Sequence, residues 1–513
     1  MTAEVKNGYR WLIAAMATVL MLCLGTVYAW SFWQSLLVHD FKDVFGWSNA
    51  QVAWIFSFAI FFLGVTAAIG GVQLPKRNPR TMAMVGTALF AVGYAIAAFA
   101  FSIRSLVLLY VGYGLIGGIG LGLGYVTPVA VVSKWFPDKK GLATGLVVMG
   151  FGLGALFMSK ILAPVFLGLT GNNLVTTFLL LAAVFLVLGV GSAAFMRNPP
   201  EGWQPAGFQK AIATKKTETY PEVGVGRALL SRRFVFLWVV FFCNITAGIS
   251  IISFQSPLFQ NLWKQVDPTL AAVTLSLFGA TLVAVSSLFN GAGRFLWGGI
   301  SDRIGRTQTF RIMLGSEILV FAALIITRDP WVFAVLVCWV LLCYGGGFGT
   351  MPSFIGDVFG PKLMSSVYGV VLTAWGAAGV VGPQIFAAFQ DRIGGERASQ
   401  WSFIVAGCFT IVGLVLTLML SNKPFEAKAA ASVPAAAAPA AAKHAAAPAA
   451  AVAAVAAPAA RRAIAAKPVA KKTAKTAPAK KTPAKKASAK KAGAKKTAAK
   501  KAAPKKAAKR AGR

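Results

Sequence analysis

The feature that most constrains the fold is a series of twelve long apolar segments separated by shorter polar stretches. As α-helices rising about 1.5 Å per residue, such segments are long enough to cross the roughly 30 Å hydrocarbon core of a bilayer. They run from Trp11 to about Leu37 and near 49–74, 82–101, 106–132, 141–167, 174–196, 234–258, 271–299, 308–327, 331–355, 365–389 and 399–420. The chain is therefore predicted to be an all-α membrane protein with twelve transmembrane helices.

The polar stretch 197–233 divides these segments into two sets of six. We expect an N-terminal six-helix half at 1–196, a cytoplasmic linker at 197–233 and a C-terminal six-helix half at 234–422. The first segment is too long for a signal peptide and lacks a convincing cleavage site, so we expect it to be retained as a helix.

The two halves repeat each other in sequence. Thr127-Pro128 recurs as Met351-Pro352, 224 residues later, and glycine-rich runs occur at 117–124 and 345–349. Parallel repeats of this kind enclose a binding site near the middle of the membrane. The glycines allow helices either to pack tightly or to slide past one another.

Charge is distributed unevenly along the chain. Residues 423–513 hold 24 of the 51 Lys and Arg residues, but 1 of the 15 Asp and Glu residues. This Ala-, Pro- and Lys-rich stretch is predicted to be a disordered tail that binds anionic lipid or nucleic acid, or remains a solvated extension. Basic residues are also concentrated in alternate short loops, which predicts that both termini are cytoplasmic. We expect the membrane to be the inner membrane of a bacterial cell.

Arg294 is the charged residue whose position within an apolar segment is least expected. It lies within 271–299, eight residues before Asp302 at the following turn, which is about 12 Å along a helix. A guanidinium at that depth costs a few kcal/mol or more unless it faces water, a partner or a ligand. We predict that Arg294 binds an anion; the alternative is a structural arginine satisfied by backbone carbonyls.

Other reactive side chains give little sign of chemistry. The five cysteines all fall within apolar segments, without the spacing of a disulfide framework or metal site. No nucleophile–base constellation appears outside the membrane, so we expect no enzymatic activity, no cofactor and no metal. Glu317 lies in the ninth segment, and we favour local packing over proton transfer for it.

The loop after the eighth segment carries a family signature. Residues 298–306 match G-x-x-x-D-R-x-G-R, with Asp302, Arg303, Gly305 and Arg306 at the defining positions. This pattern resembles the motif of the major facilitator superfamily, in which it forms a conformational latch at the cytoplasmic ends of helices. The first-half copy has Pro75 at the acidic position, so we expect Asp302 to carry more of the latch.

Three further stretches, 28–31, 134–145 and 289–302, resemble the oxalate/formate antiporter family, and the resemblance extends over residues 8–421. In that family an arginine of helix 8 and a lysine of helix 11 bind the two carboxylates of oxalate, between aromatic walls. The resemblance implies that the arginine is Arg294 and that the substrate site includes the aromatic residues Tyr28, Tyr125, Tyr344 and Phe348.

The chain departs from that family at Trp375, which occupies the position of the lysine. A site with one cation leaves a second carboxylate unpaired, so we expect a monocarboxylate such as formate, lactate or pyruvate rather than oxalate. Trp375 either forms part of the site or only packs between helices. We expect a monomeric carrier that works by exchange or proton symport. The rival interpretation is a membrane receptor or tether whose basic tail binds nucleic acid or lipid.

Overall fold

The computed structural model describes residues 7–205 and 224–422, which form helices joined by turns. Twelve helical spans in this part of the chain are long and apolar enough to cross a membrane. The predicted all-α fold with twelve transmembrane helices is therefore confirmed. The predicted basic tail, 423–513, and residues 206–223 of the predicted linker lie outside the described residues.

The first six spans are built partly from shorter helices, because 3₁₀ or π turns interrupt four of them. Short α3 (Lys42–Phe45) lies between the first two spans. The helices of the six spans are α1 (Asn7–Gly25), α2 (Trp30–Ser35), α4 (Asn49–Gln73), α5 (Pro79–Ser102), α6 (Leu106–Leu109), α7 (Gly117–Trp135), α8 (Lys140–Phe157), α9 (Ala163–Leu169), α10 (Leu174–Val184) and α11 (Val190–Ala193).

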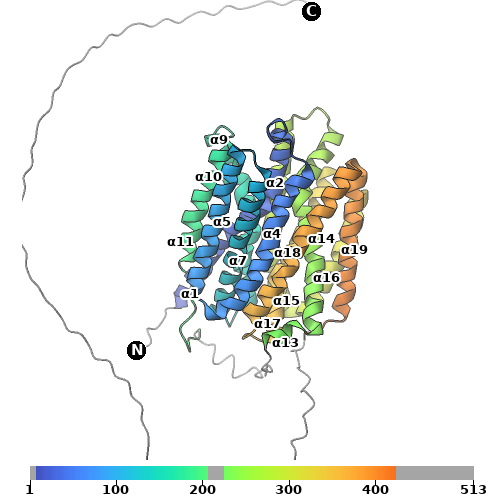
Figure 1. Ribbon diagram of the computed structural model, residues 1–513. Helices are drawn as coiled ribbons and strands as arrows, with labels where there is room; N and C mark the ends of the chain where they lie inside the picture. Colours follow the sequence, from blue (N-terminus) through green and yellow to red (C-terminus); the bar gives the residue numbers. More distant parts are fainter. Residues whose placement is uncertain (1–6, 206–223, 423–513) are drawn as a thin grey trace, which may run out of the picture. The chain divides into compact units, whose positions relative to one another are not determined.

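The last six spans are single helices, preceded by the short α13 (Val225–Leu229). They are α14 (Arg232–Val266), α15 (Ala272–Ile304), α16 (Arg306–Ile326), α17 (Pro330–Phe359), α18 (Met364–Arg392) and α19 (Gly395–Leu418). The long helices of both sets run along a common direction as one bundle (Figure 1).

Helices extend beyond the predicted apolar segments. The seventh segment was predicted at 234–258, whereas α14 runs to Val266. Hydrophobicity marks the part of a helix that lies in hydrocarbon, but backbone hydrogen bonding continues past that boundary. At the other end of α14 the helix begins at a local cap, because the Ser231 hydroxyl accepts a hydrogen bond from the Phe234 amide at 3.2 Å.

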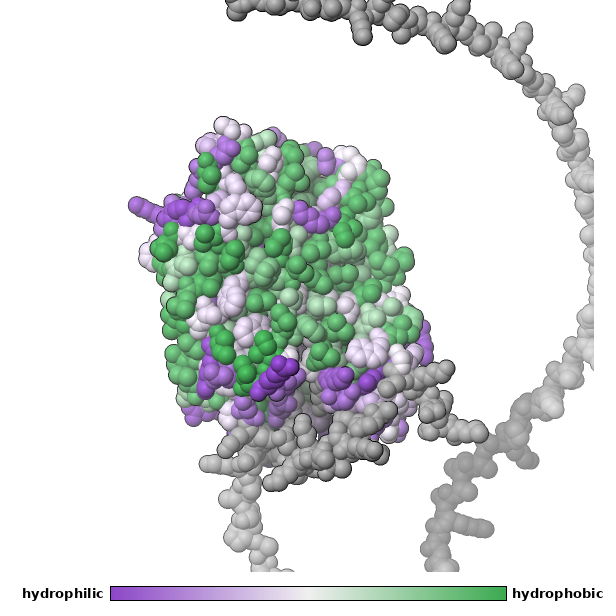
Figure 2. Space-filling model, turned by 180° about the vertical axis from the view of Figure 1, so that it is seen from behind, coloured by the Kyte–Doolittle hydropathy of each residue, from purple (hydrophilic) through white to green (hydrophobic). Residues whose placement is uncertain are grey.

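The outer surface matches the predicted membrane environment. A broad hydrophobic region covers the middle of the bundle, and hydrophilic residues gather near its two ends (Figure 2). Val107, Leu319 and Val335 are among the large apolar side chains that point outward, each about 70% exposed. A continuous apolar surface of this kind is incompatible with water and fits lipid chains.

The two sets of six helices meet through glycines. Helix α4 packs along α18, and α8 packs along α15. A Cβ atom added to Gly64 would lie 2.8 Å from the Cα of Gly376, and one added to Gly152 would lie 2.7 Å from the Cα of Gly291. Backbones can approach this closely only where side chains are absent. These contacts bring the helices together tightly enough to bury what lies between them.

Candidate functional site

Arg294 of α15 is completely buried. Its Nε donates a hydrogen bond to Asn290 Oδ1 at 3.2 Å, and its Nη1 donates to the Tyr125 hydroxyl at 3.4 Å. Its Nη2 is buried without a hydrogen-bond partner, and no ion pair among the described residues includes Arg294. Both hydrogen bonds go to side chains rather than to backbone carbonyls. The guanidinium therefore keeps its charge and one amino group that needs an acceptor.

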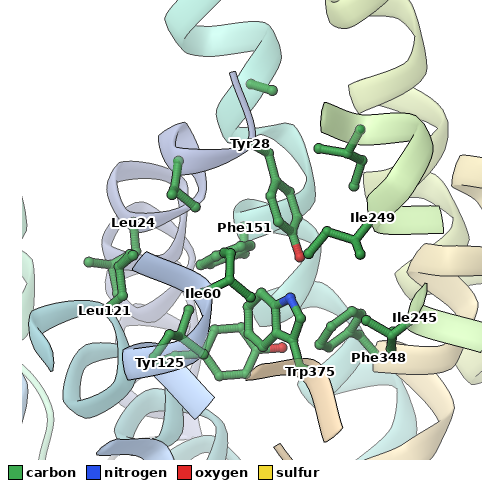
Figure 3. Packing of buried hydrophobic residues seen from close by; sticks show 14 of the residues in the cluster. Leu24, Tyr28, Ile60, Leu121, Tyr125, Phe151, Ile245, Ile249, Phe348 and Trp375 are labelled. Carbon is green, nitrogen blue, oxygen red and sulfur yellow. The ribbon is translucent and has the colours of Figure 1, made fainter. Parts of the chain in front are cut away.

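Aromatic rings enclose this guanidinium. Its Cζ lies 4.4 Å from the ring centroid of Phe348, 5.3 Å from that of Phe151 and 5.9 Å from that of Tyr28. The three rings converge on one region between the helices (Figure 3). Ring faces attract a cation, by about 2 kcal/mol or more where water is excluded. The rings stabilise the buried charge but do not neutralise it.

Four tyrosines form two hydroxyl pairs around Arg294. Tyr28 of the first span and Tyr344 of α17 lie 2.5 Å apart at their hydroxyl oxygens. Tyr125 of α7 and Tyr368 of α18 are 3.5 Å apart at theirs. Each pair joins one set of six helices to the other. A phenol can donate to a carboxylate as readily as to another phenol, so both pairs can exchange a partner for an anion.

Trp375 of α18 is fully buried and closes the aromatic cluster. Its ring centroid lies 4.6 Å from that of Phe348, 5.1 Å from that of Tyr125 and 5.5 Å from that of Phe151, all in edge-on geometry. Its indole N–H lies near the Tyr344 hydroxyl but forms no well-aligned hydrogen bond. Trp375 thus provides an apolar wall together with one spare donor.

The structure brings all six residues that sequence analysis assigned to the substrate site into one buried cluster. Their side chains are between 0 and 2% exposed; they are Arg294, Tyr28, Tyr125, Tyr344, Phe348 and Trp375. Some of these residues belong to the first six-helix set and the others to the second. Residue spacing within one helix therefore cannot account for their proximity. None of the six side chains is open to solvent.

Sequence reasoning missed three members of this cluster: Asn290, Phe151 and Tyr368. Asn290 precedes Arg294 by four residues, and Tyr368 precedes Trp375 by seven. Residues at these spacings share a face of a helix, so both had a detectable signal. Phe151 had none, because it reaches the site only through the packing of α8 against α15.

The predicted latch residues lie at one end of α15. Arg306 contacts Asp302 at 2.5 Å and Asp357 of α17 at 3.0 Å, and it also donates to Ser301. We call Asp302, Arg306 and Asp357 the Asp302 cluster. Gly305 has φ +89°, a conformation that favours glycine. Arg303 is exposed beside this cluster.

The Asp302 cluster faces the other set of helices. A Cβ atom added to Gly141, at the start of α8, would lie 2.7 Å from Asp302 Oδ2. A carboxylate placed at a helix N-terminus is stabilised by the helix dipole. In the first set, where Pro75 stands at the acidic position, Arg10 pairs with Asp138 at 2.9 Å.

The opposite end of the bundle is held by different chemistry. Gln260 Nε2 donates to Ser35 Oγ at 3.0 Å, and Lys160 Nζ donates to Thr281 Oγ1 at 2.8 Å. Both hydrogen bonds link the first set of helices to the second. Both acceptors are hydroxyl groups, so neither of these two contacts between the sets is an ion pair; the ion pair of Arg328 with Glu396 at this end lies within the second set.

Twelve candidate membrane spans in the described chain, arranged around a buried cation with contacts between two helix sets at both ends, are typical of a membrane transport protein. The family model described as Major Facilitator Superfamily matches residues 11–383. The chain belongs to this superfamily, as its loop signature predicted, and is a multi-pass membrane protein.

Curated relatives give a finer comparison. The oxalate:formate antiporter of Oxalobacter formigenes is 27% identical, over 80% of this chain and 91% of the relative. The apicoplast pyruvate carrier 1 of Toxoplasma gondii is 27% identical, over 72% of this chain and 81% of the relative. Monocarboxylate transporter 11 of Homo sapiens is 24% identical, over 80% of this chain and 83% of the relative. The predicted resemblance to the oxalate/formate antiporter family is confirmed as a similarity.

Proposed function

We propose that this protein is a secondary transporter of small monocarboxylates, such as formate, lactate or pyruvate, and that it works by alternating access. The observation that carries the proposal is the state of Arg294: fully buried, unpaired with any acid in the described chain, and with Nη2 lacking an acceptor. A carboxylate would supply that acceptor and balance the charge.

Each residue of the site has a distinct role in this proposal. Arg294 pairs with the carboxylate. Tyr28, Tyr125 and Tyr344 turn their hydroxyl groups from one another towards the anion. Phe348 and Trp375 form apolar walls that accept a short carbon chain and exclude water.

The count of cations favours one carboxylate over two. Trp375 stands where the oxalate/formate antiporter family carries a lysine, and its ring contacts are aromatic. A second carboxylate would be desolvated there without a cationic partner, at a cost of several kcal/mol. The names of the relatives include formate, pyruvate and monocarboxylates, which agree with this class of substrate, and also oxalate, which the test below includes as the competitor.

The surroundings of the site suit alternating access. Glycine-lined contacts between α4 and α18 and between α8 and α15 let the two sets of helices rock against each other with few side chains to reorder. The proposed location is a bacterial inner membrane, and the distribution of basic loops supports an orientation with the Asp302 cluster on the cytoplasmic side.

Counterflow into proteoliposomes tests the function. Vesicles containing the purified protein are loaded with one unlabelled anion, and uptake of the labelled anion is followed for formate, lactate, pyruvate and oxalate. Monocarboxylates should exchange faster than oxalate, and empty liposomes give the background. Uptake no faster than this background for every anion would rule out the proposed substrate class. Oxalate as the best substrate would contradict the argument from charge.

A further inference from the structure

A carboxyl side chain is also buried within the membrane spans of the described chain. Glu317 is the twelfth of the 21 residues of α16, near the middle of that span, and it has no exposed surface. The helix itself lies at the periphery, packed against α17 and α19, but this side chain points inward. A carboxyl group at such a depth usually has a functional partner.

The hydrogen bonds of Glu317 are incomplete in a specific way. Asn244 of α14 donates from Nδ2 to Glu317 Oε2 at 3.4 Å. Glu317 Oε1 and Asn244 Oδ1 are both buried without a partner. Both of these atoms are acceptors while the carboxyl group is ionised, so neither can satisfy the other. A proton on Glu317 turns the carboxyl group into a donor as well.

The groups around Glu317 in the described chain do little to stabilise a negative charge. The titratable groups that face this region are the Cys343 thiol of α17 and the Cys243 thiol, which lies between α14 and α19. Arg311, on α16 itself, donates to the Thr417 carbonyl. Glu317 takes part in no ion pair within the described chain. A carboxyl group without a cationic partner in apolar surroundings keeps its proton.

One helix lies between this pair and the anion site. Asn244 Oδ1 packs against Gly347 of α17, where a Cβ atom would collide with it. On the same short stretch, Gly345 packs against Asn290, and Gly349 packs against the backbone of Arg294. The glycine run of α17 therefore touches the surroundings of Glu317 on one side and the helix that carries Arg294 on the other.

A second chain of contacts follows the same route. The rings of Phe241, one turn before Asn244, and Phe348 have centroids 5.1 Å apart. Phe348 in turn lies 4.4 Å from Arg294 Cζ. A single shift of α17 against α14 would therefore both move Phe348 and separate Gly347 from Asn244. Such a shared element is what physical coupling between two sites requires.

We propose that Glu317 and Asn244 form a proton-binding site coupled to the anion site, which makes the carrier a proton–monocarboxylate symporter. This inference rests on the proposed function and names its co-transported ion. The occluded carrier holds the anion at Arg294 and the proton on the Glu317 carboxyl group. One anion and one proton cross together, so the cycle moves no net charge, and both leave when α17 moves away from α14.

Proteoliposomes that contain a trapped pH-sensitive dye test the coupling. Downhill entry of the fastest anion among formate, lactate and pyruvate should acidify the lumen with native protein. Glu317→Gln should lose this acidification while counterflow of the same anion continues, because exchange needs no proton release. Glu317→Asp, which keeps a titratable group, should restore part of it. Glu396→Gln is the matched control, since Glu396 is half-exposed and paired with Arg328, and it should behave as native.

The outcomes separate the two proposals. Counterflow without acidification by the native protein overturns the symport inference and leaves the transport function standing, as does equal acidification by Glu317→Gln. A measurement independent of transport is the infrared carbonyl band of a protonated carboxylic acid, which shifts in D₂O. At neutral pH the native protein should show this band, and Glu317→Gln should lose it. An identical spectrum for both proteins would overturn the proton site even if no anion is transported.

Discussion

At the scale of single residues, the site depends on a charge that is stabilised but left unneutralised. Two side-chain hydrogen bonds and three ring contacts hold Arg294, yet none of them is an acid. A salt bridge within the protein would have to break each time an anion entered. The aromatic surroundings avoid that competition, because a carboxylate can approach Nη2 without displacing another carboxylate.

Removing this charge should abolish transport. Arg294→Ala is expected to insert normally and to lose counterflow by about a hundredfold or more, because loss of a buried ionic partner costs about 3 kcal/mol or more. Arg294→Lys should recover little, since lysine lacks the planar fork. Arg328→Ala is the matched control, as its partner Glu396 lies at the start of α19. Near-native uptake by Arg294→Ala would end the assignment of the anion site.

Trp375 provides the corresponding test of selectivity. Trp375→Lys should shift preference towards oxalate by placing a second cation near Arg294, while Trp375→Phe should keep the native preference because it retains an aromatic wall. The shift should be modest, since a buried lysine is itself desolvated. Competition of oxalate against formate and lactate in the same vesicles measures it. An unchanged preference in Trp375→Lys would show that charge count does not select the substrate.

At the scale of helices, the interfaces between the two sets are set by glycines rather than by large side chains. At Gly64 of α4, an added Cβ would press on the backbone of α18, whereas at Gly315 of α16 it would meet nothing within 4 Å. Glycine-to-alanine substitutions at these two positions should therefore have different effects. One separates the helices that close the site, and the other only changes a lipid-facing helix.

Gly64→Ala should slow transport because forcing a methyl group into a filled interface costs about 1–3 kcal/mol. Gly315→Ala should leave the rate unchanged and stabilise its helix slightly. Initial rates of counterflow, normalised to the amount of inserted protein, compare the two. If both variants transport equally well, close contact between α4 and α18 is not needed for the cycle.

Helix-scale features also mark the limit of prediction from sequence. Hydrophobicity predicted the twelve spans, because each span meets lipid independently of the others. The grouping of Arg294 with Tyr28 and Tyr344 came from resemblance to a family. Phe151 was missed, since nothing in its own helix indicates which helix of the other set it meets. The sequence favours local packing for Glu317, because periodicity cannot show that Asn244 donates to its carboxyl group or that its second oxygen has no partner.

At the scale of the whole molecule, the transport unit should not need the basic tail. Deleting residues 430–513 is expected to leave counterflow intact. The isolated peptide 461–513 has 21 basic and no acidic residues. Its binding to anionic vesicles or DNA should weaken steeply with added salt, as titration of sodium chloride would show. Loss of transport on deletion, or salt-independent binding, would each require a structured role for the tail.

The unequal chemistry of the two ends has a kinetic consequence. One end closes on the ion pairs of the Asp302 cluster, and the other closes on hydrogen bonds that Gln260 and Lys160 donate to hydroxyl groups. The barriers to opening at the two ends should therefore differ, and the barrier at the Asp302 cluster should depend more strongly on ionic strength. Because of detailed balance, this difference in barriers cannot change the final ratio of anion concentrations across the membrane. The difference should instead give the two faces of the carrier different half-saturation concentrations for the same anion.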